Sequence, residues 1–215
     1  PVAGRPMLAH ILDFLRTGGV DDVVINLHHL GHLIEREIGD GGAYGLRVRY
    51  SREDPILDTG GGIKHAERLL AGEPFVVVNG DSLLELRLAE VIDFHRSRGG
   101  IATMVVRADA DAARYGLVEV DDQDRVRRIS GRPPGGPTDG LRGFMFPGLH
   151  VLEPSIFAQM EAGAPFGIAK VTYPRVIEAG EAIYAFATSA RWINIDTPAA
   201  LDQADETLRK TPFRF

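Results

Sequence analysis

The stretch FVVVNGDS, residues 75–82, decides the fold. Its first four residues form a short, mostly β-branched apolar run, which is typical of a strand covered on both faces. A glycine and a carboxylate follow where the chain turns. Ligands of open α/β sheets bind outside the carboxyl ends of strands, so Asp81 is placed to hold a metal ion over bound phosphates. The competing interpretation is an Asp that only stabilises the turn, because Asp is a favoured turn residue.

Helix and strand patterns alternate on both sides of this stretch. Apolar residues spaced by three and four predict helices, and short β-branched runs predict strands. The expected helices cover residues 7–18, 30–38, 60–70 and 88–98, and the expected strands cover 23–27, 46–50 and 101–106. This alternation predicts an α/β fold with a doubly wound, mostly parallel, Rossmann-like sheet.

The pattern changes after residue 108. Residues 116–120 and 125–129 flank an Asp-rich turn and predict a hairpin, so we expect a small antiparallel β insertion. Further strands are expected at 144–152, 183–187 and 191–195, with helices at 154–160, at 171–179 and after Pro198. No composition shift divides the chain, so residues 1–215 are expected to form a single domain.

Composition excludes several classes of function. The chain has 215 residues, 44% of them hydrophobic, which is enough for one large core. Its net charge of −6 argues against a nucleic-acid partner. The absence of cysteine excludes disulfides and thiolate metal sites. Neither a long apolar run nor a leader pattern is found, so we expect a cytoplasmic protein with no membrane partner.

A glycine run forms the second candidate site. The segment LDTGGGI, residues 57–63, places three glycines at a predicted helix start. Without side chains, their backbone N–H groups are open to a base or a phosphate. The alternative is a flexible turn before a helix, since glycine runs are common in loops.

The third candidate site is WINIDTP, residues 192–198. On a strand, Asn194 and Asp196 point the same way, so either oxygen can reach a metal held by Asp81. Alternatively, Asp196 or Thr197 caps the last helix, with Pro198 at its first position. The two interpretations are compatible.

Taken in order, these pieces resemble the sugar-phosphate nucleotidyltransferase family. The resemblance spans essentially the whole chain, and LDTGGGI and INLHHLGHLI are closest in form to N-acetylmuramate 1-phosphate uridylyltransferases and bacterial mannose-1-phosphate guanylyltransferases. The matching segments are PVAGRPML, VVINLHHLGHLI, IGDGGAYGLRVRYSRE, LDTGGGIKHA, FVVVNGDSL, RYGLVEVD, FPGLHVLEPSIF and WINIDTP.

The resemblance implies an enzyme that transfers a nucleotidyl group from a nucleoside triphosphate, UTP or GTP, to a sugar 1-phosphate. The products are an NDP-sugar and pyrophosphate, the cofactor is Mg²⁺, and the protein is a monomer or homodimer. The alternative is a catalytically inactive, nucleotide-sugar-binding regulatory subunit of the same fold.

The resemblance also implies roles for individual residues. The residues matching the nucleotide-binding positions are Thr59, Gly60, Gly61, Asn79 and Gly80. Those matching the sugar-phosphate positions are Gly116, Arg132, Gly148 and Lys170, and the metal candidates are Asp81, Asn194 and Asp196.

Three departures from the family pattern affect these expectations. The family's opening strand and Gly-rich loop, with its catalytic Arg and Lys, would lie before Pro1, so we expect this chain to be impaired and to lack a central strand. The usual Glu-Lys-Pro is replaced by Gly131-Arg132-Pro133. Asn194 stands at the second metal-binding Asp, and we expect Asp196 to compensate.

Overall fold

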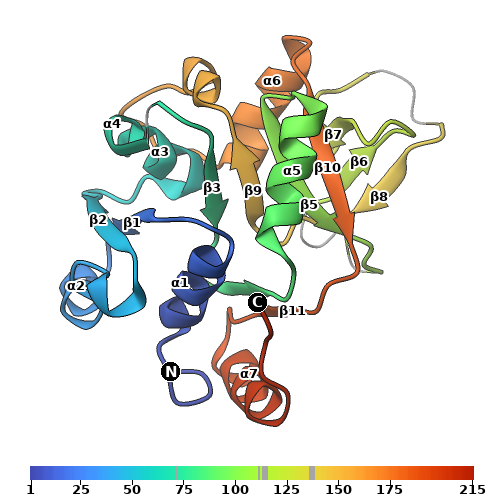
Figure 1. The fold of residues 1–215 in the computed structure, drawn as a ribbon. Coiled ribbons are helices and arrows are strands. Elements are labelled where there is room, and N and C mark those ends of the chain that lie inside the picture. The colour runs from blue at the N-terminus through green and yellow to red at the C-terminus, as the bar shows by residue number, and fades with distance from the viewer. Residues whose placement is uncertain (71, 111, 113–115, 136–138) are drawn as a thin grey trace.

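The fold was analysed in a computed structural model, which describes residues 1–70, 72–110, 112, 116–135 and 139–215 (Figure 1). The first half contains α1 (Met7–Thr17), β1 (Asp22–Leu27), α2 (Gly31–Ile38), η1 (Gly42–Tyr44), β2 (Arg47–Arg52), α3 (Asp58–His65), α4 (Glu67–Leu70), β3 (Phe75–Val78), β4 (Ser82–Leu84), α5 (Leu88–Arg98) and β5 (Ala102–Arg107). The second half contains β6 (Val118–Val120), β7 (Val126–Ile129), β8 (Arg142–Phe144), β9 (Leu149–Leu152), η3 (Pro154–Gln159), η4 (Ile168–Thr172), α6 (Tyr173–Glu178), β10 (Ile183–Thr188), β11 (Trp192–Asn194) and α7 (Pro198–Lys210).

The main sheet has the strand order β10-β5-β9-β3. β10 and β5 are parallel, whereas β9 runs antiparallel to both β5 and β3. Helix α5 covers one side of this sheet (Figure 1). The predicted α/β class with a Rossmann-like sheet is confirmed, and the reversed strand β9 is an addition to it.

The single strand expected over residues 144–152 is two strands, β8 and β9. Pro147 lacks a backbone N–H, and Gly148 adopts a φ of +87°, which a residue with a side chain rarely adopts. The chain therefore leaves the insertion at this point and enters the main sheet. β8 stays in the three-stranded antiparallel sheet β7-β6-β8, which confirms the predicted insertion.

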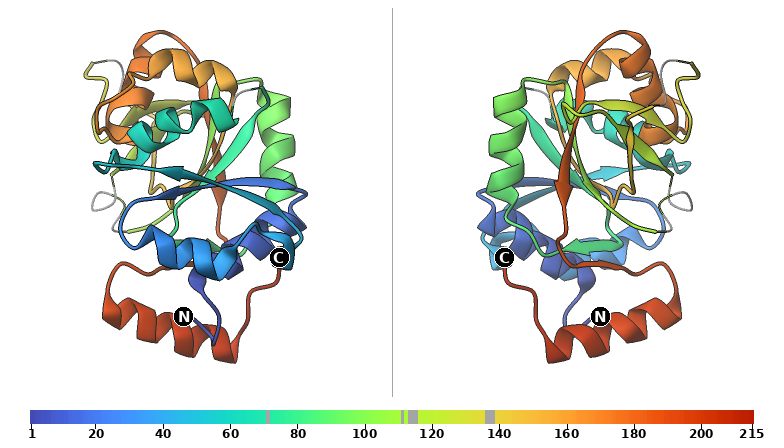
Figure 2. Two further views of the ribbon diagram at one scale, coloured as in Figure 1. Left: turned by 90° about the vertical axis from the view of Figure 1, so that its left-hand side faces the viewer. Right: turned by 90° about the vertical axis from the view of Figure 1, so that its right-hand side faces the viewer.

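A parallel pair, β1 and β2, lies to one side of the main sheet with α1 and α2 (Figures 1 and 2). Within the described residues, neither strand hydrogen-bonds to the main sheet. A further antiparallel pair, β4 and β11, leads into α7.

The main core packs between the sheet, the insertion and α6. Its fully buried members include Met104, Leu152, Ile156 and Tyr173. A smaller cluster, which includes Leu12 and Ile25, packs β1 and β2 against α1 and α2. Within the described residues, no helix is both long enough and apolar enough to cross a membrane.

Candidate active site

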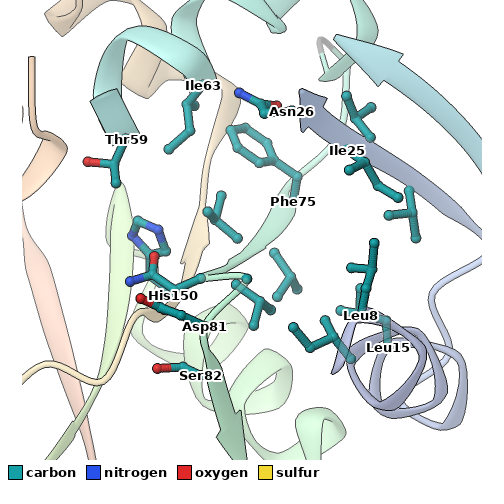
Figure 3. Close-up of a pocket in the computed structure, with 18 of the residues that line it drawn as sticks. Leu8, Leu15, Ile25, Asn26, Thr59, Ile63, Phe75, Asp81, Ser82 and His150 are labelled. Atoms are coloured by element: carbon teal, nitrogen blue, oxygen red, sulfur yellow. The ribbon is translucent and has the colours of Figure 1, made fainter. Parts of the chain in front are cut away.

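A cavity of about 630 Å³ lies between α1, β1 and β3. Most of its lining is apolar and includes Leu8, Leu15 and Ile25, while its polar lining includes Thr59 and Asp81 (Figure 3). Among the described residues, no Lys or Arg lines this cavity. The lining carries two carboxylates, of which Asp22 is paired with Arg47. The cavity, called the first cavity below, therefore combines an apolar interior with acidic groups.

Asp81 is held in a tight turn after β3. The Asn79 N–H donates to the Gly148 carbonyl over 2.9 Å, and the Asp81 carbonyl accepts from Ile195 N over 2.8 Å. A Cβ atom on Gly148 would lie 2.5 Å from the amide of Asn79, so glycine is required there. The backbone on both sides of Asp81 is thus fixed, while its exposed carboxylate faces the first cavity.

Asn194 comes to the same cavity from the β4–β11 pair. Ser82 and Asn194 are opposite residues in this ladder, so their side chains lie on one face. Ser82 Oγ lies 3.5 Å from Asn194 Oδ1 and 3.2 Å from Trp192 Nε1. Ser82, Trp192 and Asn194 all line the first cavity.

Asp196 is not brought to this cavity. β11 ends at Asn194, so the alternation of a strand does not extend to Asp196, which is exposed and not part of the lining. Thr197 Oγ1 accepts from Ala200 N over 3.1 Å and caps α7, with Pro198 in the first turn. The structure thus confirms the predicted cap, and the metal role of Asp196 stays a prediction.

Magnesium prefers oxygen ligands and keeps several waters, so one or two carboxylates and substrate phosphates are enough to bind it. Among the described residues, no group of three or more His, Asp or Glu side chains could hold a metal. At the carboxyl end of β3, the side chains that line the first cavity and carry an oxygen include Asp81 and Asn194. This set fits Mg²⁺ shared with a phosphate ligand, and it does not form a cage of protein ligands.

The glycine run packs against a distant segment. Gly60 N and Gly61 N both donate to the Phe166 carbonyl, over 2.8 and 3.1 Å. Thr59 Oγ1 accepts from Ile168 N over 3.1 Å. The idea that these glycine N–H groups are open to a ligand was wrong, because residues 164–166 occupy that space. The nucleotide-binding role of Thr59, Gly60 and Gly61 stays a prediction.

A second cavity of about 670 Å³ lies between the insertion and α6. Its charged lining residues are Arg132, Lys170, Arg175 and Glu178, so three cations face one carboxylate. The structure therefore brings together Arg132 and Lys170, which the sequence places 38 residues apart. This second cavity is basic where the first is acidic.

The two predicted sugar-side glycines lie apart. A Cβ on Gly116 would lie 3.0 Å from Ser130 Oγ, and Ser130 lines the second cavity. Gly148 instead packs on Asn79 at the first cavity. Arg114 and Tyr115 of the RYGLVEVD segment lie outside the described residues.

The π-helical segment η4 separates the two cavities. Its first two residues, Ile168 and Ala169, line the first cavity, and Lys170 and Val171 line the second. Single π-helical turns frequently occur at functional sites. Sequence patterns did not reveal this wall, since they indicated only a helix that starts at residue 171.

His150 on β9 is a site residue that the sequence did not single out. It lines the first cavity (Figure 3) but is only 2% exposed. Burial lowers its pKa to about 3, so the ring is neutral at pH 7. Burial also raises the pKa of Tyr173, whose hydroxyl therefore keeps its proton and donates to His150 Nδ1. The sequence signal for this site residue was the single histidine in the segment FPGLHVL. Because it lies within an apolar run, the pattern predicted only a strand at this position.

Comparison with known proteins gives the family. A model of the nucleotidyl transferase family matches residues 1–211. The chain belongs to this family. The resemblance inferred from the motifs is therefore confirmed.

Individual relatives agree with this assignment. The chain is 30% identical over 199 residues to a mannose-1-phosphate guanylyltransferase of Mycobacterium tuberculosis, covering 92% of this chain and 54% of the relative. It is 26% identical to a UTP–glucose-1-phosphate uridylyltransferase of Synechocystis, covering 91% and 53%. The chain thus spans about half the length of the curated relatives it matches.

A solved structure shares the fold. HddC from Yersinia pseudotuberculosis superposes with a TM-score of 0.79 over 97% of this chain and 88% of that chain, at 23% identity. At this identity the likeness supports the fold alone.

Proposed function

We propose that this chain is the transferase domain of a sugar-1-phosphate nucleotidyltransferase. The observation that carries the proposal is the placement of Asp81 at the carboxyl end of β3, facing a cavity, with a separate basic cavity behind η4. Family membership supports it, as do the activities in the names of the two curated relatives.

The proposed reaction is an in-line displacement at the α-phosphorus of a nucleoside triphosphate. An oxygen of the sugar 1-phosphate forms a new bond to that phosphorus, and the bond to the pyrophosphate oxygen breaks. No protein nucleophile is needed, so the residues act by positioning the two substrates and stabilising charge.

Asp81 would hold Mg²⁺ in this site together with phosphate oxygens. When bound, the ion supplies Lewis-acid stabilisation of the charge on the transferring group. The carboxylate suits this role because it is exposed to the first cavity while hydrogen bonds fix the backbone around it.

The nucleotide is proposed to enter the first cavity near Thr59, Asn79 and Gly80. The described lining of this cavity offers no cation for a triphosphate. We propose that the active enzyme also has a strand between β1 and β3, followed by a Gly-rich loop that carries an Arg and a Lys. Two observations support the strand: the cavity is mainly apolar, and β1 and β3 each have one edge unpaired among the described residues.

The sugar phosphate is proposed to lie on the other side of η4. Arg132 and Lys170 are exposed to the second cavity, where they can donate to phosphate oxygens. Gly131 removes the family's carboxylate beside Arg132, so this side of the sugar loses one acceptor. Arg in place of Lys offers a planar, two-pronged contact with a phosphate.

UTP or GTP is the proposed donor, and Mg²⁺ is the proposed cofactor. One curated relative is named as a guanylyltransferase and the other as a uridylyltransferase, so the experiment below tests both bases. The cysteine-free composition also supports the proposal of a cytoplasmic enzyme.

The test follows pyrophosphate release from UTP, GTP and the other triphosphates with glucose, mannose and N-acetylmuramate 1-phosphates. The chain is assayed alone and with a family-type strand and Gly-rich loop fused before Pro1. We expect the extended form to turn over at least one pair in a Mg²⁺-dependent way. Asp81→Asn is expected to lower that rate at least about a hundredfold, because the ion supplies several kcal/mol of transition-state stabilisation.

The matched control is Asp122→Asn, which removes an exposed carboxylate from the turn before β7 and should leave the rate unchanged. No turnover of any pair by the extended form, despite measurable nucleotide-sugar binding, would favour the inactive binding subunit instead.

A further inference from the structure

The amide of Asn194 is oriented by a neighbour with a defined hydrogen-bonding role. Trp192 Nε1 can only donate, so Ser82 Oγ accepts from it at 3.2 Å. The Ser82 proton is then left for Asn194 Oδ1, which lies 3.5 Å away. Ser82 is 2% exposed, so water does not compete for its hydroxyl.

This arrangement decides which end of the amide faces the ligand. Asn194 Oδ1 is turned toward Ser82 on the protein side. Asn194 Nδ2 has no hydrogen-bond partner among the residues that the structure describes, and Asn194 lines the first cavity with Asp81. The group offered to the cavity is therefore an NH₂ donor.

We propose that Asn194 donates a hydrogen bond to a phosphate oxygen of the bound nucleotide or pyrophosphate, and does not ligate the metal ion. The proposal rests on the function proposed above. Phosphate oxygens only accept hydrogen bonds, so an amide NH₂ complements them, while a metal ion requires the oxygen that faces Ser82. Ser82 acts as a positioning residue through Asn194.

The other carboxylate in the cavity lining, Asp22, is paired with Arg47, so the metal would then depend on Asp81. Asp196 offers no replacement in this geometry, because β11 ends at Asn194 and Asp196 lies outside the cavity lining. A single carboxylate with phosphate oxygens and waters is within the normal range of Mg²⁺ sites.

Two binding measurements test this assignment without turnover, and both use the extended form because the described lining of the first cavity offers no cation to a phosphate ligand. The first is titration calorimetry with Mn²⁺ alone, and the second is titration with inorganic pyrophosphate in the presence of a chelator. Asn194→Ala should leave Mn²⁺ affinity within about twofold and weaken pyrophosphate binding about tenfold, the usual effect of losing a hydrogen bond to a charged group. Asp81→Asn should weaken Mn²⁺ binding at least about tenfold.

Asn194→Asp should move the two affinities in opposite directions. The added carboxylate tightens Mn²⁺ binding and weakens metal-free pyrophosphate binding by repulsion. A purely structural role of Asn194 would not produce this divergence. Gln123→Glu, which adds the same charge in an exposed turn, should change neither affinity.

Ser82→Ala tests the positioning step. With the hydroxyl gone the amide can turn, so Asn194→Ala should weaken pyrophosphate binding less in this background than in the parent. An equal effect in both backgrounds would show that Ser82 does not orient Asn194.

Asn194→Ala could instead weaken Mn²⁺ binding as much as Asp81→Asn does. That result would make Asn194 a metal ligand and overturn this assignment, while leaving the proposed function in place. Failure of the extended form to bind pyrophosphate would count against both the assignment and the proposed function. Thermal unfolding of each variant shows whether a loss of binding reflects loss of fold.

Discussion

The two sides of the site differ in how they are supported. On the proposed sugar side, β5 and β9 are each paired on both edges, and their side chains pack into a large core with α6 and the insertion. On the proposed nucleotide side, β1 is paired only with β2 among the described residues, and a small cluster packs behind it. The first cavity lies between the two sides (Figure 3).

This difference in packing indicates which substitutions should affect stability and which should affect ligand binding. Residues of the large core are surrounded by close-packed atoms, so their loss affects the whole fold. Residues facing the first cavity already lack neighbours on one side, so changes there should affect stability less and ligand binding more.

The largest expected effect compares one leucine from each side. Leu152 lies in the large core and Leu12 lines the first cavity, and both are 0% exposed. Leu152→Ala should lower the free energy of unfolding by about 4 kcal/mol, because the vacated space is enclosed. Leu12→Ala should cost about 2 kcal/mol, because fewer contacts are lost beside an existing cavity. Urea denaturation of the two variants measures both values, and equal losses would contradict the contrast between the two sides.

A pH-dependent loss of stability is expected from His150, which lies on β9 in the main sheet. The pKa of His150 is about 3 in the folded state, against about 6.5 when unfolded. Between these values only the unfolded chain takes up the proton, so the contribution of His150 is complete well above pH 6.5 and declines as the pH falls through that value. From pH 6.5 to pH 5 the decline is about 1.6 kcal/mol, because the slope rises from half to nearly all of 1.36 kcal/mol per pH unit over this range.

The variant His150→Gln should remove that part of the pH dependence in urea denaturation at pH 6.5 and pH 5. His32→Gln, at an exposed position on α2, serves as the matched control and should retain it. The same slope in His150→Gln as in the parent would assign the effect to other groups.

Two of the predicted nucleotide-binding glycines, Gly60 and Gly80, differ in how closely they are packed. A Cβ on Gly60 would lie 2.9 Å from the Phe166 carbonyl and collide with its ring, whereas nothing lies within 4 Å of a Cβ on Gly80. Gly60→Ala should lower the free energy of unfolding by about 1–2 kcal/mol through overpacking, and Gly80→Ala should stay within about 0.5 kcal/mol. Thermal unfolding compares them. A neutral Gly60→Ala would mean that residues 164–166 do not hold this position.

Sequence patterns predicted the local parts of this molecule well. The strand predicted over residues 75–79 is found at 75–78, and the predicted helix at 88–98 is found with the same bounds. Both follow from continuous apolar runs and helical spacing, which depend on neighbours along the chain. The turn carrying Asp81 was found for the same reason, since a buried strand followed by glycine and Asp is a local signal.

The parts that sequence did not predict depend on distant contacts. Residues 164–166 cover Gly60 and Gly61 from about a hundred positions away, and no periodicity reports such a contact. The reversal at Pro147 and Gly148 is hidden between two apolar runs that look like one strand. The sequence pattern predicted that Asp196 shares a strand face with Asn194. However, β11 ends at Asn194, where its pairing with β4 ends, and the sequence does not show that pairing.

The smallest expected effect concerns residues 196 and 197, and it separates helix capping by Thr197 from metal binding by Asp196. Thr197→Ala removes the hydrogen bond to Ala200 N and should lower the free energy of unfolding by about 1 kcal/mol, while Thr197→Asp keeps an acceptor and should lose little. Asp196→Ala should change neither the stability, within about 0.5 kcal/mol, nor the Mg²⁺ dependence of turnover. Thermal unfolding and a Mg²⁺ titration of the extended form measure the two quantities. A shifted Mg²⁺ dependence in Asp196→Ala would mean that this carboxylate reaches the metal in the extended form, and that the end of β11 moves when the first cavity is filled.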